Sequence, residues 1–72
     1  MTLDRAKKGH ILRIVAIENP EVRAQVIRFG ISEGEMVKCS EVIPAGPIII
    51  CKNRQEIAFG RNLAQSITVD LV

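Results

Sequence analysis

Apolar and polar residues alternate most regularly in the final segment, Ser66 to Leu71, which reads SITVDL. Successive side chains of a β-strand point to opposite faces, so this pattern predicts a strand with one buried face. We expect the side chains of Ile67, Val69 and Leu71 to face the core and the side chains between them to face solvent.

Four earlier segments also have the composition of strands, because they are rich in β-branched residues or alternate with a period of two. The third of them is apolar almost throughout, which is typical of a strand buried on much of both faces. In chain order the segments are Gly9 to Glu18, residues 35–43, Pro47 to Lys52 and Gln55 to Phe59.

Two short stretches predict the turns between the last three of these strands. Pro44-Ala45-Gly46-Pro47 cannot continue a strand pairing, because it combines two prolines with a glycine. Asn53-Arg54 suits a tight two-residue turn, so the strands on either side of it are expected to form a hairpin.

A short helix, Pro20 to Phe29, is predicted between the first two strands. Asn19 can cap its N-terminus, Pro20 fits the first helical position, and Gly30 stands where a left-handed C-terminal cap belongs. The spacing of the apolar residues assigns a core-facing stripe, with Ile27 and Ile31 flanking it. The stripe consists of Val22, Val26 and Phe29.

Together these elements predict one mainly β domain that spans residues 1–72. The segment Gly60 to Gln65 is too short for a standard helix but suits a single helical turn, with Leu63 and Ala64 pointing inward. Five short strands, one inserted short α-helix and one single-turn helix favour closure into a small barrel, which removes exposed strand edges.

Composition excludes several classes of binding site and of protein. The chain has no tryptophan or tyrosine and only two phenylalanines, so it cannot build the aromatic platforms that hold single-stranded nucleic acid or proline-rich peptides. The net charge of +2 is spread along the chain, whereas phosphate binding favours a concentrated basic face, so a small nucleic-acid-binding barrel is the less favoured alternative function. The polar start and the short apolar runs predict a cytoplasmic chain without signal peptide or direct membrane insertion.

The residues that could carry chemistry are few. The chain has one histidine, His10, and no nucleophile elbow, HExxH or phosphate-binding motif, so we expect no catalytic residues and no enzyme activity. Cys39 and Cys51 lack CxxC spacing and are expected to be buried apolar residues. No resident cofactor is predicted.

The two thiols and His10 remain weak candidates for metal ligands, with transient binding of Fe²⁺ or Zn²⁺ as the alternative function. The geometry depends on the turn between their strands. If the turn pairs Ile43 with Pro47, Cys39 lies directly opposite Cys51; if it pairs Ile43 with Ile48, the two thiols fall on opposite faces.

The order of these elements and their punctuating residues resembles the ferrous iron transport protein A (FeoA) family over nearly the whole chain. The resemblance implies an SH3-like barrel with an inserted helix. Val26, Phe29 and Phe59 stand where the family usually has leucine. The resemblance rests on Leu3, Gly9, the segment Arg23 to Ile31, Gly34, the turn Pro44 to Pro47, Ile57-Ala58-Phe59, Leu63-Ala64 and Ile67 to Val69.

The resemblance implies a non-enzymatic accessory role in bacterial ferrous iron uptake. The partner it implies is the FeoB-type membrane permease, near its GTP-binding domain, which would hold the chain at the inner face of the cell membrane. Self-association into a homo-oligomer is left open by the sequence.

Our expectation for the partner surface comes from the helix and the hairpin. A groove between the helix and the barrel would be lined by Val26, Ile27 and Ile31, although core packing of these residues is the simpler interpretation. Four basic side chains could steer an acidic partner or merely keep the surface soluble. They are Arg23, Arg28, Lys52 and Arg54.

Overall fold

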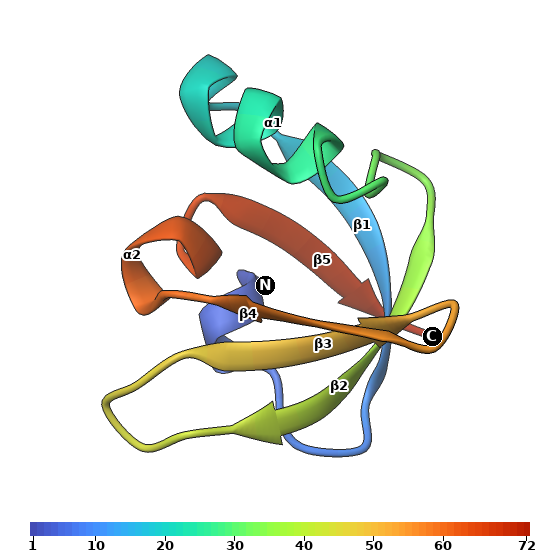
Figure 1. Cartoon of the computed structure of the whole chain (residues 1–72), viewed down its shortest axis with the longest axis vertical. Helices are drawn as coiled ribbons and strands as arrows, with labels where there is room; N and C mark the ends of the chain where they lie inside the picture. The colour runs from blue at the N-terminus through green and yellow to red at the C-terminus, as the bar shows by residue number, and fades with distance from the viewer.

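The computed structural model describes all residues, 1–72, as a five-stranded antiparallel sheet with three short helical segments (Figure 1). The sheet order is β4-β3-β2-β1-β5, and the sheet curls around one core. The strands are β1 (Ile11–Ile17), β2 (Met36–Val42), β3 (Ile48–Lys52), β4 (Gln55–Phe59) and β5 (Ile67–Leu71). The helices are η1 (Leu3–Arg5, 3-10), α1 (Pro20–Ile27) and α2 (Arg61–Ala64).

The mainly β, SH3-like fold expected from the sequence is therefore confirmed, with all five strands, the inserted helix and the single turn in place. The expected closure of the barrel is not complete. The hydrogen-bonded sheet ends at β4 on one side and at β5 on the other. The outer edges of β4 and β5 are thus not paired with each other, and the rest of the chain covers only one of them.

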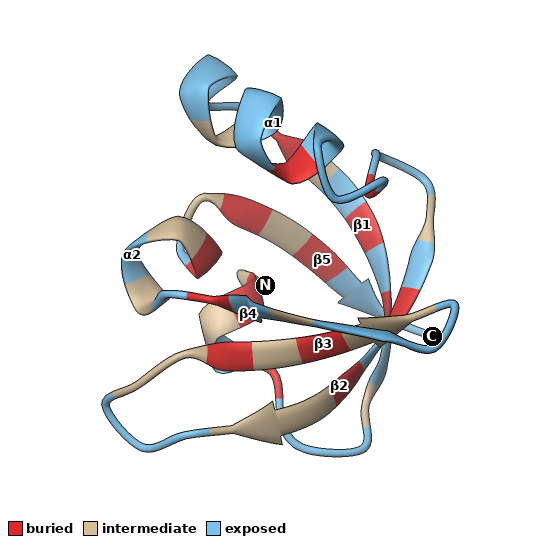
Figure 2. Ribbon diagram, viewed as in Figure 1, coloured by how far each residue is buried: buried red, intermediate tan, exposed pale blue.

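The core contains fifteen buried residues, all of them apolar, and no buried polar side chain (Figure 2). A core without polar groups needs no internal hydrogen-bond partners, so burial of aliphatic area is its main source of stability. The buried residues are Leu3, Ala6, Leu12, Ile14, Ile17, Val26, Ile31, Val37, Cys39, Ile48, Ile50, Phe59, Ala64, Ile67 and Val69.

The N-terminal segment, which reads as polar in sequence, is part of this core. Leu3 is fully buried and Ala6 nearly so. Thr2 forms a bridge with Thr68, and the amide of Val69 donates to the carbonyl of Met1. The first residues therefore cover the outer edge of β5, which the sequence pattern did not predict.

Helix α1 begins as expected and ends earlier than expected. The side chain of Asn19 accepts hydrogen bonds from the amides of Glu21 and Val22, and Pro20 occupies the first turn. The helix ends at Ile27, followed by a turn in which Gly30 has a φ of +76°, the left-handed conformation that glycine adopts freely. No helix in the chain is long and apolar enough to cross a membrane.

The predicted core stripe of this helix is wrong at one position. Val26 is buried and Val22 packs against the core, but Phe29 is 48% exposed. The reason is the early helix end: residues beyond Ile27 leave the helical path, so the spacing that placed Phe29 over Val26 no longer applies. Leu71 is likewise exposed, at 58%, because it lies at the end of β5 beside the chain terminus.

The turns define the pairing of the central strands. The amide of Ile43 donates to the carbonyl of Pro47, which is the first of the two registers considered above. A β-bulge between Cys39 and Glu41 then shifts the pairing, so that Cys39 lies opposite Ile50 and Lys38 opposite Cys51. Asn53 and Arg54 both have positive φ, as a two-residue hairpin turn requires.

Candidate functional site

Two of the three apolar residues expected to line a partner groove are core residues. Val26 is 0% exposed and Ile31 is 1% exposed, so neither presents a surface to a partner. Only Ile27 is open to solvent, at 54%. The structure therefore corrects the predicted groove and supports core packing for Val26 and Ile31.

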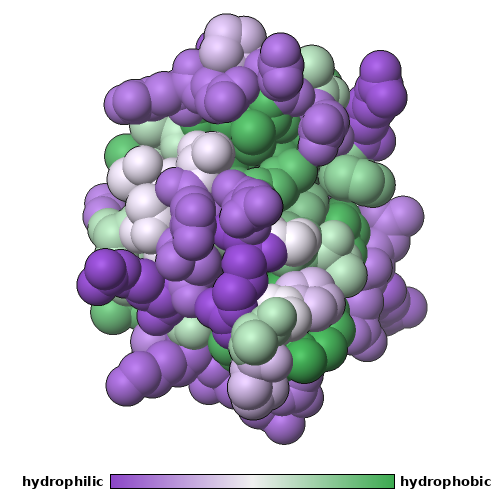
Figure 3. Space-filling view, turned by 90° about the vertical axis from the view of Figure 1, so that its left-hand side faces the viewer, coloured by the Kyte–Doolittle hydropathy of each residue, from purple (hydrophilic) through white to green (hydrophobic).

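The largest groove lies instead between β4 and the turn that follows α1. Its volume is about 480 Å³, and its lining includes one of the predicted residues, Arg28, together with Phe29 and four residues of β4. Those four are Gln55, Glu56, Ile57 and Ala58. On the side of the molecule that carries α2, apolar atoms lie open to solvent beneath the polar upper end that α1 forms (Figure 3).

Three apolar residues line the groove, Phe29, Ile57 and Ala58, and Phe29 belongs to an aromatic pair. The ring of Phe29 packs at a tilt against that of Phe59, with 6.0 Å between centroids. Phe59 is buried and Phe29 is half-exposed, so the pair joins the core to the surface. The sequence analysis placed Phe29 in the core-facing stripe of the helix, and it assigned no residue of β4 to a partner surface.

The charges around the groove are not neutralised within the chain. Arg28 lines the groove and forms no ion pair, and Glu56 also has none. Arg54 is exposed in the turn at the tip of the β3–β4 hairpin and is likewise free. The excess of free positive charge makes this region suited to an acidic partner.

Arg23, by contrast, is held by its own chain. Its Nε donates to the carbonyl of Ile17 at 3.1 Å, and its terminal nitrogen bonds Glu33 at 3.0 Å. The same Glu33 oxygen accepts the amide of Ile17 at 2.9 Å. Arg23 and Glu33 line a second hollow of about 120 Å³ with Ile27, but their side chains already satisfy one another. Arg23 thus fastens α1 to the end of β1.

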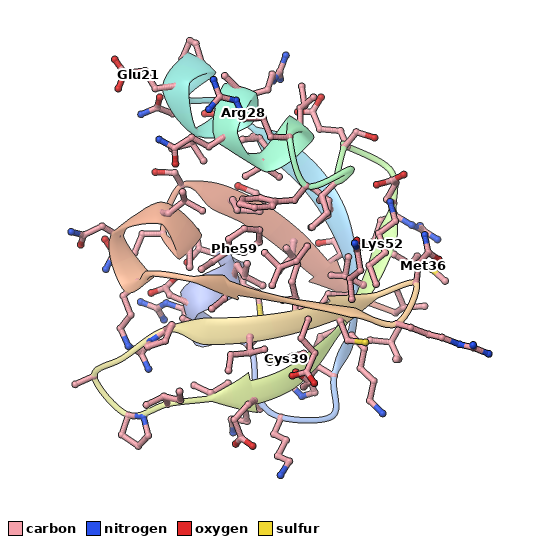
Figure 4. The ribbon with its side chains drawn as sticks, in the orientation of Figure 1. Glu21, Arg28, Met36, Cys39, Lys52 and Phe59 are labelled. Carbon is pink, nitrogen blue, oxygen red and sulfur yellow. The ribbon has the colours of Figure 1, made fainter.

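Lys52 also forms its contacts within the chain. Its ammonium group donates to the carboxylate of Glu35 and to the carbonyl of Gly30, both at 2.5 Å. Figure 4 shows the side chain of Lys52 directed toward the loop that joins α1 to β2. Of the four basic residues considered from the sequence, only Arg28 and Arg54 are therefore free to meet a partner.

This contact predicts an acid-sensitive contribution to stability. The hydrogen bond from Lys52, followed by one from the Ser32 amide, lowers the pKa of Glu35 below its ordinary value of 4.5. Because the folded chain holds this carboxylate ionised more strongly than the unfolded chain, the contribution is complete above pH 4.5 and is lost as pH falls through the folded pKa. We expect Glu35→Gln to flatten the fall in unfolding free energy below pH 4.5.

Urea denaturation at a series of pH values measures this effect. Glu56→Gln is the matched control, because the carboxylate of Glu56 forms no ion pair. Equal acid slopes for Glu35→Gln and the unmodified chain would show that the contact does not contribute.

The two thiols do not converge. Although the turn has the register that would have placed them opposite each other, the bulge after Cys39 separates them. Cys39 points inward and is fully buried, whereas Cys51 pairs with exposed Lys38 on the outer face and is half-buried. Burial raises the pKa of the Cys39 thiol, which disfavours the thiolate that a metal requires.

His10 does not complete a metal site either. Its Nδ1 accepts the amide of Lys7 at 3.1 Å, so one ring nitrogen is engaged in a local turn. No group of three or more histidine, cysteine, aspartate or glutamate side chains is arranged to hold an ion. The three weak candidate ligands, His10, Cys39 and Cys51, therefore do not form a preorganised centre.

Comparison with known proteins identifies relatives of the whole chain. The model of the FeoA domain family matches residues 1–71. A crystal structure of an iron uptake regulatory protein (FeoA) superposes with a TM-score of 0.90 at 26% identity, covering 100% of this chain and 97% of that one. No curated protein sequence matches.

Two further structures extend the comparison. FeoA from Chlorobium tepidum has a TM-score of 0.84 at 28% identity, covering 100% of this chain and 70% of that one. The manganese regulator SloR has a TM-score of 0.89 at 15% identity, and this chain covers 34% of it. The last similarity is one of fold alone, to a module within a longer protein.

Proposed function

The chain belongs to the FeoA domain family, which is involved in ferrous iron transport, and from this membership we propose that it is a non-enzymatic accessory protein that binds the cytosolic part of a FeoB-type iron permease. In this role the chain works in the cytoplasm and reaches the inner face of the membrane through its partner. The proposal requires neither a resident cofactor nor contact with nucleic acid.

The observation that carries the proposal is the groove beside β4. It combines a half-exposed phenylalanine, Phe29, with a cation that forms no ion pair, Arg28, in one hollow. A partly exposed aromatic residue in a hollow, with charges at its rim, is a common arrangement of a protein-binding site. The residues that could hold a metal are dispersed, so nothing in the geometry favours a metal sensor over a docking module.

Co-purification tests this assignment. Tagged chain should retain the permease, and Phe29→Asp should weaken retention at least tenfold, since loss of a central aromatic contact costs about 2 kcal/mol or more. Val15→Asp is the matched control: Val15 is exposed to a similar degree, 43% against 48%, on β1 and away from the groove lining.

Two outcomes would contradict the proposal. If folded chain retains no permease in any nucleotide state, the assigned partner is wrong. If the two aspartate variants weaken retention equally, the partner contact does not lie at the groove.

A further inference from the structure

The two edges of the sheet differ in how their backbone groups are used. The outer edge of β5 is covered by the first residues, which bridge Thr2 to Thr68. The outer edge of β4 has no strand beside it, and no backbone hydrogen bond joins β4 to any element other than β3. An exposed strand edge presents unpaired amides and carbonyls that can pair with another chain.

The hairpin identifies which backbone groups are free. Its two-residue turn makes the flanking residues, Lys52 and Gln55, a hydrogen-bonded pair. Hydrogen-bonded and non-bonded pairs alternate along an antiparallel ladder, so Ile57 and Phe59 also bond to β3. Glu56 and Ala58 therefore direct their amides and carbonyls away from β3, toward the open edge.

The largest groove of the molecule runs along this same edge. Glu56 and Ala58 line one side of it, and Arg28 and Phe29 line the other. Figure 4 shows Arg28 beside α1 and, below it, Phe59 of β4, whose ring packs against that of Phe29. Free backbone groups and an apolar side chain thus face the same hollow.

We propose that the open edge of β4 binds an extended, acidic segment of a partner protein as an added strand. The segment pairs with the backbone of Glu56 and Ala58, places an apolar side chain against Phe29 and Ile57, and directs acidic side chains toward Arg28 and Arg54. Backbone pairing gives affinity in such contacts, and alternate side chains give specificity. In identifying the permease as the source of the segment, the inference rests on the proposed function; strand addition itself does not.

A single segment fits this site better than a second copy of the chain. The end of α1 forms the wall facing β4, so an occupant lies between a strand and a helix end and cannot bring a sheet behind it. Charge leads to the same conclusion. A second copy would offer its own β4, which reads QEIAF and carries a single acidic residue next to the cation Arg54, so it would bring no excess of negative charge to Arg28 and Arg54.

The test uses the full chain and a synthetic peptide, acetylated and amidated EVTVTVE. We expect saturable binding, with amide hydrogen exchange of Glu56 and Ala58 slowed at least about tenfold at saturation, as for newly formed hydrogen bonds. Ala58→Pro removes one outward amide without touching the bonds to β3, and proline is tolerated at such edge positions. It should weaken peptide binding at least tenfold, while the control Ala58→Thr should bind as the unmodified chain does.

A second pair of reagents tests the proposal on intact protein. Two versions of the peptide are N-methylated, one on each of the two alternating sets of backbone amides. Only one set faces β4 in an added strand, so methylation of that set should weaken binding at least tenfold more than methylation of the other. Failure of the unmethylated peptide to bind, or equal binding of both methylated peptides, would overturn strand addition. A dimer of the chain that Ala58→Pro abolishes would overturn the choice of a partner segment as the occupant. Retention of the permease by a chain that binds no peptide would refute this inference alone, and peptide binding without permease retention would refute only the assigned partner.

Discussion

Replacing Leu3 with alanine should lower the free energy of unfolding by about 2–5 kcal/mol, because the side chain is completely buried and its removal leaves a cavity. Domains of this kind are stable by only about 5–15 kcal/mol in total, so this loss is a large fraction of the whole. Urea denaturation followed by circular dichroism measures it.

The chain provides a control of the same residue type. Leu71 is 58% exposed at the end of β5, so Leu71→Ala should change the unfolding free energy by no more than about 0.5 kcal/mol. Similar values for the two variants would mean that the N-terminal segment does not pack into the barrel in solution. A large loss confined to Leu3 would confirm that the first residues close the core.

The two cysteines should differ in their rate of reaction with a thiol reagent by at least about a hundredfold, with Cys51 faster. Cys51 is half-buried on the outer face, whereas Cys39 is fully buried and its pKa is raised by burial. Cys39 can react only when the structure opens. Mass spectrometry of single-cysteine variants, Cys39→Ser and Cys51→Ser, measures each rate separately.

Denatured chain is the control, because both thiols should then react at comparable rates. Comparable rates in the folded chain would contradict the bulge that separates the two side chains. The same experiment bears on metal binding: two thiols on opposite faces of the sheet cannot bind one ion together, so metal added before the reagent should not protect them jointly.

The candidate groove was only partly predictable from the sequence. Helical spacing identified Val26 as a core-facing residue, and Asn19, Pro20 and Gly30 marked the region of the helix. The same spacing placed Phe29 in the core, because nothing local shows that the helix ends at Ile27. Strand β4 was predicted with its observed bounds, yet its position at the edge of the sheet depends on which strands pair.

The roles of the basic residues likewise depend on which residues they contact in the folded chain. Arg23, Arg28, Lys52 and Arg54 are equivalent in sequence as surface cations. In the folded chain Arg23 meets Glu33, and Lys52 meets Glu35, seventeen residues away along the chain. Only contacts between distant segments distinguish the basic residues that hold the fold from those that remain free.

Local chemistry determined the type and order of the five strands, of α1 and of the single turn α2, but not the 3-10 helix η1. Alternation, capping residues and turn residues act over two to ten positions, and they predicted five strands, a capped helix and a hairpin with Asn53-Arg54 at its tip. Tertiary structure alone decided that Leu3 fills the core, that a bulge separates Cys39 from Cys51, and that β4 keeps an open edge. Each of these depends on strand pairing and packing between segments far apart in sequence, where the energy of many weak contacts outweighs any local preference.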